Sequence, residues 1–154
     1  MRMLKAAALL GLALFAAEAV AKPVGIAVSG AWIQATPPGA ATAAGYLTIV
    51  NRGREADRLV GAESSVAAKV QPHHMSMTGG IMRMRPVAGG LGIAAGATVR
   101  LAPEGDHLML IGLKSPMTPG KIVKVTLEFA RAGKVAVDVP VRAGPPAGDM
   151  GAMR

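Results

Sequence analysis

Three short stretches of this chain hold all of its histidines and most of the methionines beyond its first residues. They are His73-His74-Met75-Ser76-Met77, Met82-Arg83-Met84 and His107-Leu108-Met109. The chain contains no cysteine. Thioether sulfur is a soft ligand that suits Cu(I), and imidazole nitrogen binds copper readily. The pattern therefore predicts a copper site made from methionine and histidine side chains.

The spacing within these stretches is that of residues on one side of a β-strand, because residues i and i+2 of a strand point the same way. The pairs with this spacing are His73 and Met75, Met82 and Met84, and His107 and Met109. Thr78-Gly79-Gly80 has the composition of a hairpin turn, which would fold Met82 and Met84 back beside Met75 and Met77. Together the stretches could offer two imidazoles and two thioethers to one ion.

Other metals and a purely structural role fit these residues less well. Structural zinc sites favour thiolates, and catalytic zinc sites usually include a carboxylate or a third histidine. A blue-copper centre requires a cysteine ligand. Thioethers also escape the disulfide formation that removes free thiols in oxidising compartments. Methionine does fill gaps in cores, and core packing is the default expectation for Met77, Met82 and Met117 taken singly.

The elements that must position these residues are expected to be strands. Apolar residues alternate with polar ones in short blocks that Gly, Pro and Asn separate, and no segment keeps a helical period. Val123 to Phe129 places valine, leucine and phenylalanine on one face, and Val135 to Val141 continues the pattern after the turn Ala132-Gly133. About eight such strands predict an all-β fold, either a β-sandwich or a small barrel.

The two ends of the chain differ in composition from the rest. Arg2 and Lys5 precede an apolar run, and Ala19-Val20-Ala21 supplies the small residues that a signal peptidase reads, so residues 1–21 are expected to be a cleaved signal. The apolar run is shorter than the roughly 20 residues that span a bilayer, and we expect no stable membrane insertion. A lipoprotein anchor would need a cysteine at the cleavage site. Residues 22–142 should form one domain, and residues 143–154 a flexible tail.

The charge and the motifs also limit the function. The formal net charge is +8, and it becomes +7 when the signal takes away two basic residues and one acidic residue. The cations are scattered and only one Trp, one Tyr and two Phe could stack on bases, so we expect no nucleic-acid binding. No Gly-x-Ser-x-Gly elbow is present, and no paired carboxylates flank the histidines. The sequence therefore predicts a binding protein rather than an enzyme.

The run from His73 to Val87, with Gly89-Gly90-Leu91 and the run from Gly105 to Lys114, resembles the periplasmic copper chaperones of the PCuAC family. The family pattern is a histidine, ten residues, a methionine, a little over twenty residues, and then His-x-Met. Four residues fit it here, with ten and twenty-two intervening residues: His73, Met84, His107 and Met109. The resemblance extends over nearly the whole mature chain.

The resemblance implies a cupredoxin-like Greek-key β-barrel that lacks the cupredoxin cysteine and binds one Cu(I) per chain at an exposed site. It further implies a periplasmic protein that delivers copper to the CuA centre of cytochrome c oxidase subunit II, directly or with a Sco-type partner. The implied ligands are His73, Met84, His107 and Met109, with Met75 as an auxiliary ligand. Weak binding of Cu(II) stays open.

Four alternatives remain at this stage, two for the ligands and two for the function. His74 could replace its neighbour as the ligand, although the strand period favours His73, which shares a side with Met75. Met150 and Met153 in the tail could also touch copper. In function, the same ligands could buffer copper or confer resistance to it, and a β-sandwich that binds no metal could act as an interaction module.

Overall fold

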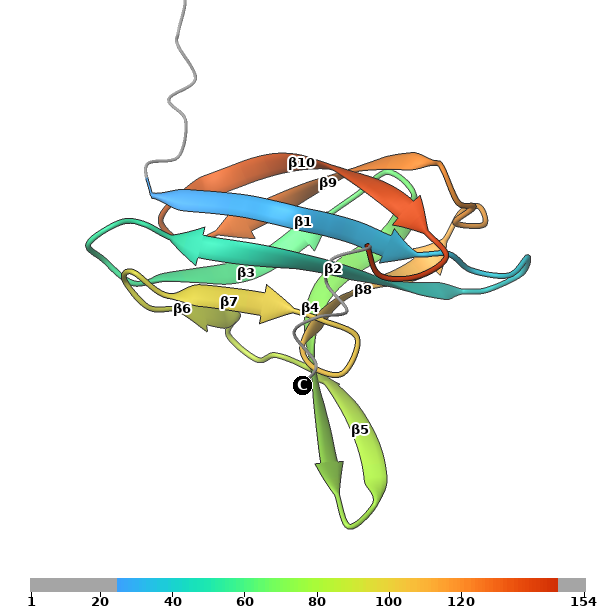
Figure 1. Ribbon diagram of the computed structural model, residues 1–154, viewed down its shortest axis with the longest axis horizontal. Helices are drawn as coiled ribbons and strands as arrows, with labels where there is room; N and C mark the ends of the chain where they lie inside the picture. The colour runs from blue at the N-terminus through green and yellow to red at the C-terminus, as the bar shows by residue number, and fades with distance from the viewer. Residues whose placement is uncertain (1–24, 147–154) are drawn as a thin grey trace, which may run out of the picture.

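The computed structural model describes residues 25–146, and every regular element in that range is a strand (Figure 1). The strands are β1 (Ile26–Gln34), β2 (Thr42–Asn51), β3 (Asp57–Glu63), β4 (Ala67–Thr78), β5 (Ile81–Pro86), β6 (Leu91–Ile93), β7 (Thr98–Leu101), β8 (His107–Leu113), β9 (Ile122–Phe129) and β10 (Gly133–Arg142). Within this range no helix has the length and hydropathy of a membrane span. The expected signal, residues 1–21, and the tail methionines Met150 and Met153 lie outside the described residues, and the expected domain boundaries stay predictions.

Seven of the strands close into a barrel. Their order is β4–β8–β2–β1–β10–β9–β3, and β3 pairs back to β4 through Ala62 and Val70. All neighbours are antiparallel except β1 and β10, which are parallel. The predicted all-β, cupredoxin-like barrel is therefore confirmed. The structure has ten strands rather than about eight, because β6 and β7 have only three and four residues, too few to show a clear alternation.

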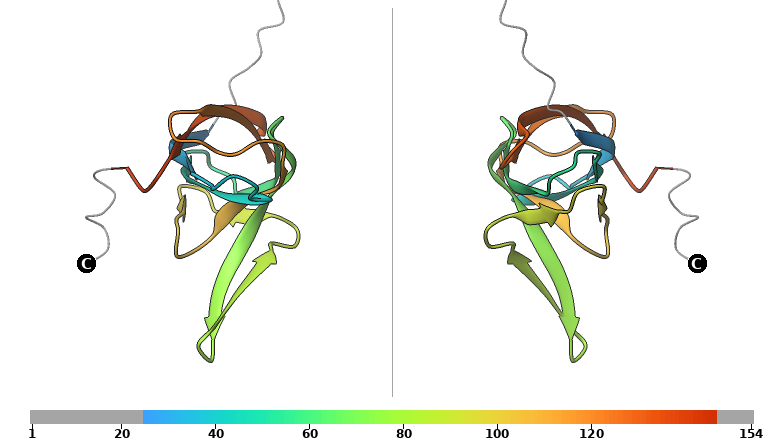
Figure 2. Two further views of the ribbon diagram at one scale, coloured as in Figure 1. Left: turned by 90° about the vertical axis from the view of Figure 1, so that its right-hand side faces the viewer. Right: turned by 90° about the vertical axis from the view of Figure 1, so that its left-hand side faces the viewer.

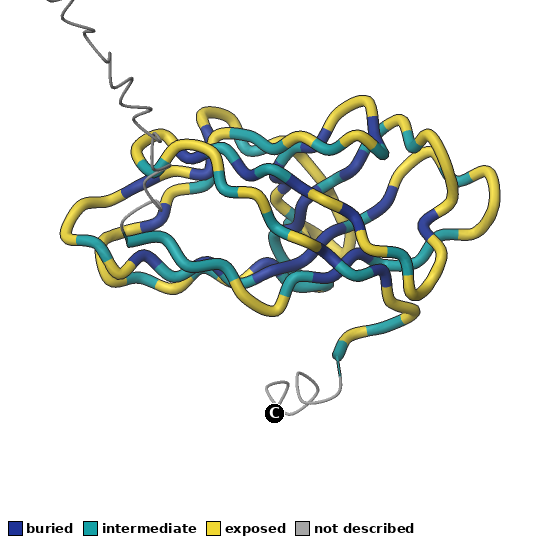
Figure 3. The backbone as a smooth tube through the Cα atoms, turned by 90° about the horizontal axis from the view of Figure 1, so that it is seen from above, coloured by how far each residue is buried: buried dark blue, intermediate teal, exposed yellow. Residues whose placement is uncertain are grey.

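The core fills the inside of this barrel with one face of each strand. On β9, Val123, Val125, Leu127 and Phe129 are buried while the residues between them are more exposed, as the alternation predicts. Figure 3 shows the same alternation of buried and exposed positions along the chain. Met117 is fully buried in this core, which confirms its expected packing role. On β8 the core residues are Leu108 and Leu110, so the residues that alternate with them face outward.

The longest strand, β4, belongs to two structures at once. Its first half lies in the barrel between β3 and β8, and its second half pairs with β5 in a hairpin that projects from the barrel (Figures 1 and 2). The hairpin turns at Gly79 and Gly80, whose φ angles are +60° and +76°. A two-residue turn with both φ angles positive matches the twist of the strands and favours glycine at both positions. Every residue of β5 is exposed.

Candidate metal centre

Two histidines from strands far apart in the sequence face each other on the outer side of the barrel wall. His73 on β4 pairs directly with His107 on β8. Their ring centroids are 5.9 Å apart, and both residues are buried. A metal–nitrogen bond of about 2.0 Å puts a ring centroid about 3.2 Å from the ion, so one ion can join rings up to about 6.4 Å apart. The observed separation lies within that reach.

A backbone carbonyl selects the tautomer of the neutral His107 ring. Its Nδ1–H donates to the carbonyl oxygen of Gly105 at 3.1 Å. The proton on Nδ1 leaves Nε2 with its lone pair, which is the form that binds a metal. The loop that immediately precedes β8 therefore leaves Nε2 of His107 in the form that a metal ion would require.

His73 has one ring nitrogen without a protein partner. Its Nε2 lies 2.8 Å from the amide nitrogen of Gln71, while Nδ1 is buried and makes no hydrogen bond. If Gln71 donates to Nε2, the proton must stand on Nδ1, where a buried unpaired N–H costs about 1–3 kcal/mol. Turning the amide by 180° lets Nε2–H donate to its oxygen and leaves Nδ1 with a lone pair. A bound cation at Nδ1 would then satisfy both nitrogens, so His73 fits a metal.

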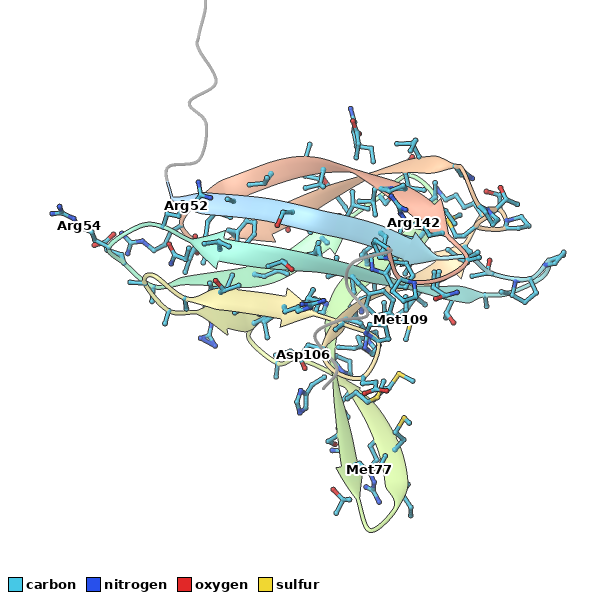
Figure 4. All side chains as sticks on the ribbon, viewed as in Figure 1. Arg52, Arg54, Met77, Asp106, Met109 and Arg142 are labelled. Atoms are coloured by element: carbon cyan, nitrogen blue, oxygen red, sulfur yellow. The ribbon has the colours of Figure 1, made fainter. Side chains whose placement is uncertain are left out.

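Methionine side chains flank the two imidazoles on the same face. Met75 pairs with Met84 on the hairpin side of His73, and Met109 pairs with Gln71 on the other side. Residues paired across strands have side chains on the same face, as do residues two apart along a strand. Figure 4 shows sulfur atoms beside the hairpin, between the labelled Met109 and Met77. In residues 25–146 no group of three His, Asp or Glu side chains could hold a metal, and the strand register instead places methionines on either side of the imidazoles.

His74 lies apart from this set. It follows His73 on β4, so its side chain points to the opposite face of the strand. There its Nδ1 lies 2.5 Å from a carboxylate oxygen of Asp106, and the His74 side chain is 61% exposed. The structure thus brings together five of the six predicted residues within the described range, His73, Met75, Met84, His107 and Met109, and separates His74 from them.

Met77 and Met82 pair on the hairpin and are 69% and 58% exposed. The expectation of core packing is therefore wrong for both. Its physical reason is that the hairpin leaves the barrel, so neither face of it is covered by a second sheet.

An aromatic pair adjoins the site. Its two residues belong to the segments that carry the family resemblance, but sequence reasoning did not place them near the site. Trp32 on β1 pairs with Tyr46 on β2, and their ring centroids are 4.7 Å apart. Tyr46 follows the β2 residue that pairs with Leu108, so it lies opposite His107 and on the same face. Both aromatic residues are buried, and burial raises the pKa of Tyr46 above its ordinary value of 10.0. Sequence reasoning also missed Gln71, which contacts the His73 ring. Because Gln71 lies two residues before His73 on a strand, the spacing could have identified it as a neighbour.

The amino-acid sequence is similar to those of known proteins. Residues 26–141 match the family described as "Putative lipoprotein LpqE-like". The chain is 39% identical over 118 residues to "Putative lipoprotein Lxx21020" of Leifsonia xyli subsp. xyli, a match that covers 77% of this chain and 70% of that relative. The chain belongs to the LpqE-like family.

Solved structures connect this LpqE-like chain to the PCuAC family. The copper-bound PCuAC domain from PmoF2 is 28% identical with a TM-score of 0.66, over 82% of this chain and 97% of that domain. The Cu(I)-bound solution structure of DR1885 from Deinococcus radiodurans is 32% identical with a TM-score of 0.57, over 75% of this chain and 76% of that protein. The resemblance to PCuAC is therefore confirmed.

The stability of this LpqE-like protein without metal should depend on pH through His73. Burial first, then the nearby His107 and Lys69, lowers the pKa of His73 below its ordinary value of 6.5. Between the lowered folded pKa and 6.5, the unfolded chain binds a proton that the folded chain does not. The free energy of unfolding should therefore fall as pH drops through this window and gain nothing from His73 above it. Urea unfolding at a series of pH values measures the effect, and a His73→Gln variant should give a flatter profile.

Proposed function

We propose that this protein is a periplasmic Cu(I) metallochaperone, not an enzyme, that delivers copper to the CuA site of cytochrome c oxidase subunit II, directly or with a Sco-type partner. The observation that carries the proposal is the His73–His107 pair, whose ring separation suits one ion bound between the two rings. The strand face that carries this pair also carries methionines. The copper-bound and Cu(I)-bound relatives support it. The family description as a lipoprotein is consistent with a location outside the cytoplasm.

One Cu(I) would be held by the two imidazoles and by thioethers from either side. His73, His107, Met84 and Met109 form the proposed ligand set. The strand register makes Met75 a strong alternative to Met84, because β4 lies between β5 and β8 and Met75 is on β4 itself. The ligand set carries no negative charge and the sulfurs do not titrate, so only the histidines must be free of protons.

The arrangement also favours release of the ion. The imidazoles are buried in the barrel wall, whereas Met84 is 51% exposed on the hairpin. An acceptor thiolate can therefore approach from the hairpin side and join the copper before a thioether leaves. Thiolate is the stronger soft ligand, so transfer to an acceptor with cysteines is favourable.

The direct test is an anaerobic titration of residues 22–154 with Cu(I) against a chromogenic chelator. We expect one tight site per chain. Met75→Leu and Met84→Leu form a matched pair, since each removes the sulfur from one of two paired positions. The substitution that removes the actual copper ligand should cause the larger loss of Cu(I) affinity. Retention of no copper by the unmodified protein would reject the proposal and favour an interaction module that binds no metal.

Growth experiments with a deletion strain distinguish copper delivery from copper buffering. A deletion strain grown at low copper should lose cytochrome c oxidase activity, and added copper should restore it. Sensitivity to excess copper with normal oxidase activity would support a buffering or resistance role instead.

A further inference from the structure

The projecting hairpin bears three thioethers around a common hollow. Met75, Met77 and Met82 line it together with Ser76 and the loop residues Pro103 and Glu104. The hollow has a volume of about 380 Å³, so it has ample room for one ion. The hollow lies beside the imidazole pair, on the side of the hairpin tip, because Met75 is two residues from His73 and Met77 is two residues further along β4.

The two methionines nearest the hairpin tip have no packing role in the barrel. Met77 and Met82 are each more than half exposed, and they contribute nothing to the core cluster. Exposed apolar side chains that gather on a projecting element usually mark a place that binds something. The chemistry of this group is three soft sulfurs beside one carboxylate, Glu104, which adds a negative charge to an otherwise neutral ligand set.

We propose that this hollow is a second binding site for a soft monovalent cation, Cu(I), formed by Met75, Met77 and Met82 with Glu104 supplying charge. Three thioethers match the preference of Cu(I) for soft ligands. Without imidazole the outer site is weaker than the inner one, so it fills second. Met75 lies between the two sites, so an ion can move from one to the other by exchanging ligands around a single shared sulfur. The proposal extends the proposed function, because both sites take the same ion.

The side chains of Arg83 and Arg85 do not oppose this site directly. They alternate with Met82 and Met84 on β5, so they face the other side of the hairpin. His74 and Asp106 meet on that other side as well. A cation on the methionine face would therefore contact the sulfurs and the Glu104 carboxylate, with the arginines on the opposite face.

The test uses the mature chain labelled with ¹³C at its methionine methyl groups and titrated with Ag(I), a soft monovalent ion that does not change oxidation state. The first equivalent should shift the methyl signals of the inner ligands, and the second should shift those of Met77 and Met82. Chelator competition with Cu(I) should likewise give two sites in the unmodified protein. A Met77→Leu/Met82→Leu variant should keep the first site, with its affinity within about twofold, and lose the second.

A Met150→Leu/Met153→Leu variant is the matched control, since it removes two thioethers from the tail. Loss of the second site in this control would place that site in the tail and overturn the proposal. A first site without any second one would also overturn it while leaving the proposed function intact, and would point to an apolar docking surface on the hairpin. Absence of the first site would count against the proposed function, whereas shifts of Met77 and Met82 would still support the outer site.

Discussion

Replacing His107 with alanine should lower the affinity of the protein for Cu(I) by at least about 100-fold, since loss of an outer partner of a metal ligand alone costs about 10- to 100-fold. His73→Ala should have an effect of similar size, because the two rings face each other across one strand pair. His74→Gln should change the affinity by less than about threefold, since its side chain lies on the opposite face of β4.

Anaerobic chelator competition with all three variants measures these affinities, and circular dichroism checks that each variant keeps the β fold. His74→Gln is the matched control because it removes an imidazole adjacent in sequence while keeping a side chain that can hydrogen-bond to Asp106. A His74 effect as large as that of His73 would show that the ion binds on the other face of the strand.

Oxidising the exposed methionines with hydrogen peroxide should reduce Cu(I) affinity by about 100-fold or more without unfolding the protein. The reaction converts a soft thioether into a hard, polar sulfoxide. The hairpin methionines Met77, Met82 and Met84 are each more than half exposed, whereas Met117 is fully buried in the core. The hairpin should therefore react first, and the core should stay intact.

Peptide mass spectrometry locates the sulfoxides, and chelator competition measures the remaining affinity. Treatment with both classes of methionine sulfoxide reductase should restore binding, because each class reduces one sulfoxide epimer. Unchanged Cu(I) affinity in a protein whose hairpin methionines are all oxidised would show that these thioethers are not ligands.

Much of the site geometry could be predicted from local pattern. The composition of Thr78-Gly79-Gly80 predicted a turn, and the structure confirms it with two positive φ angles at the glycines. That turn fixes the register that places Met75 beside Met84. The period of two along a strand separated His73 from His74, and the two side chains do lie on opposite faces.

The rest depended on contacts between segments far apart in the sequence. The pairing of His73 with His107 is set by how the barrel closes, and no local pattern specifies the register of strands so far apart. The exposure of Met77 and Met82 was mispredicted for a similar reason, since a strand that continues beyond its barrel looks like any other strand in the sequence. The contact of Gln71 with His73 could have been anticipated from their spacing. Which ring nitrogen the amide contacts depends on the orientation of the side chains, which the sequence does not specify.

Trp32 gives the molecule an optical reporter of its own. It is the only tryptophan in the chain, it is buried against Tyr46, and Tyr46 lies on the same face as His107. Because a single indole emits, every change in the tryptophan fluorescence spectrum originates at this one place, on the wall that carries the imidazoles. We expect arrival and departure of an ion at the imidazoles to change this emission, so that transfer to an acceptor without tryptophan can be followed in the unlabelled protein in real time.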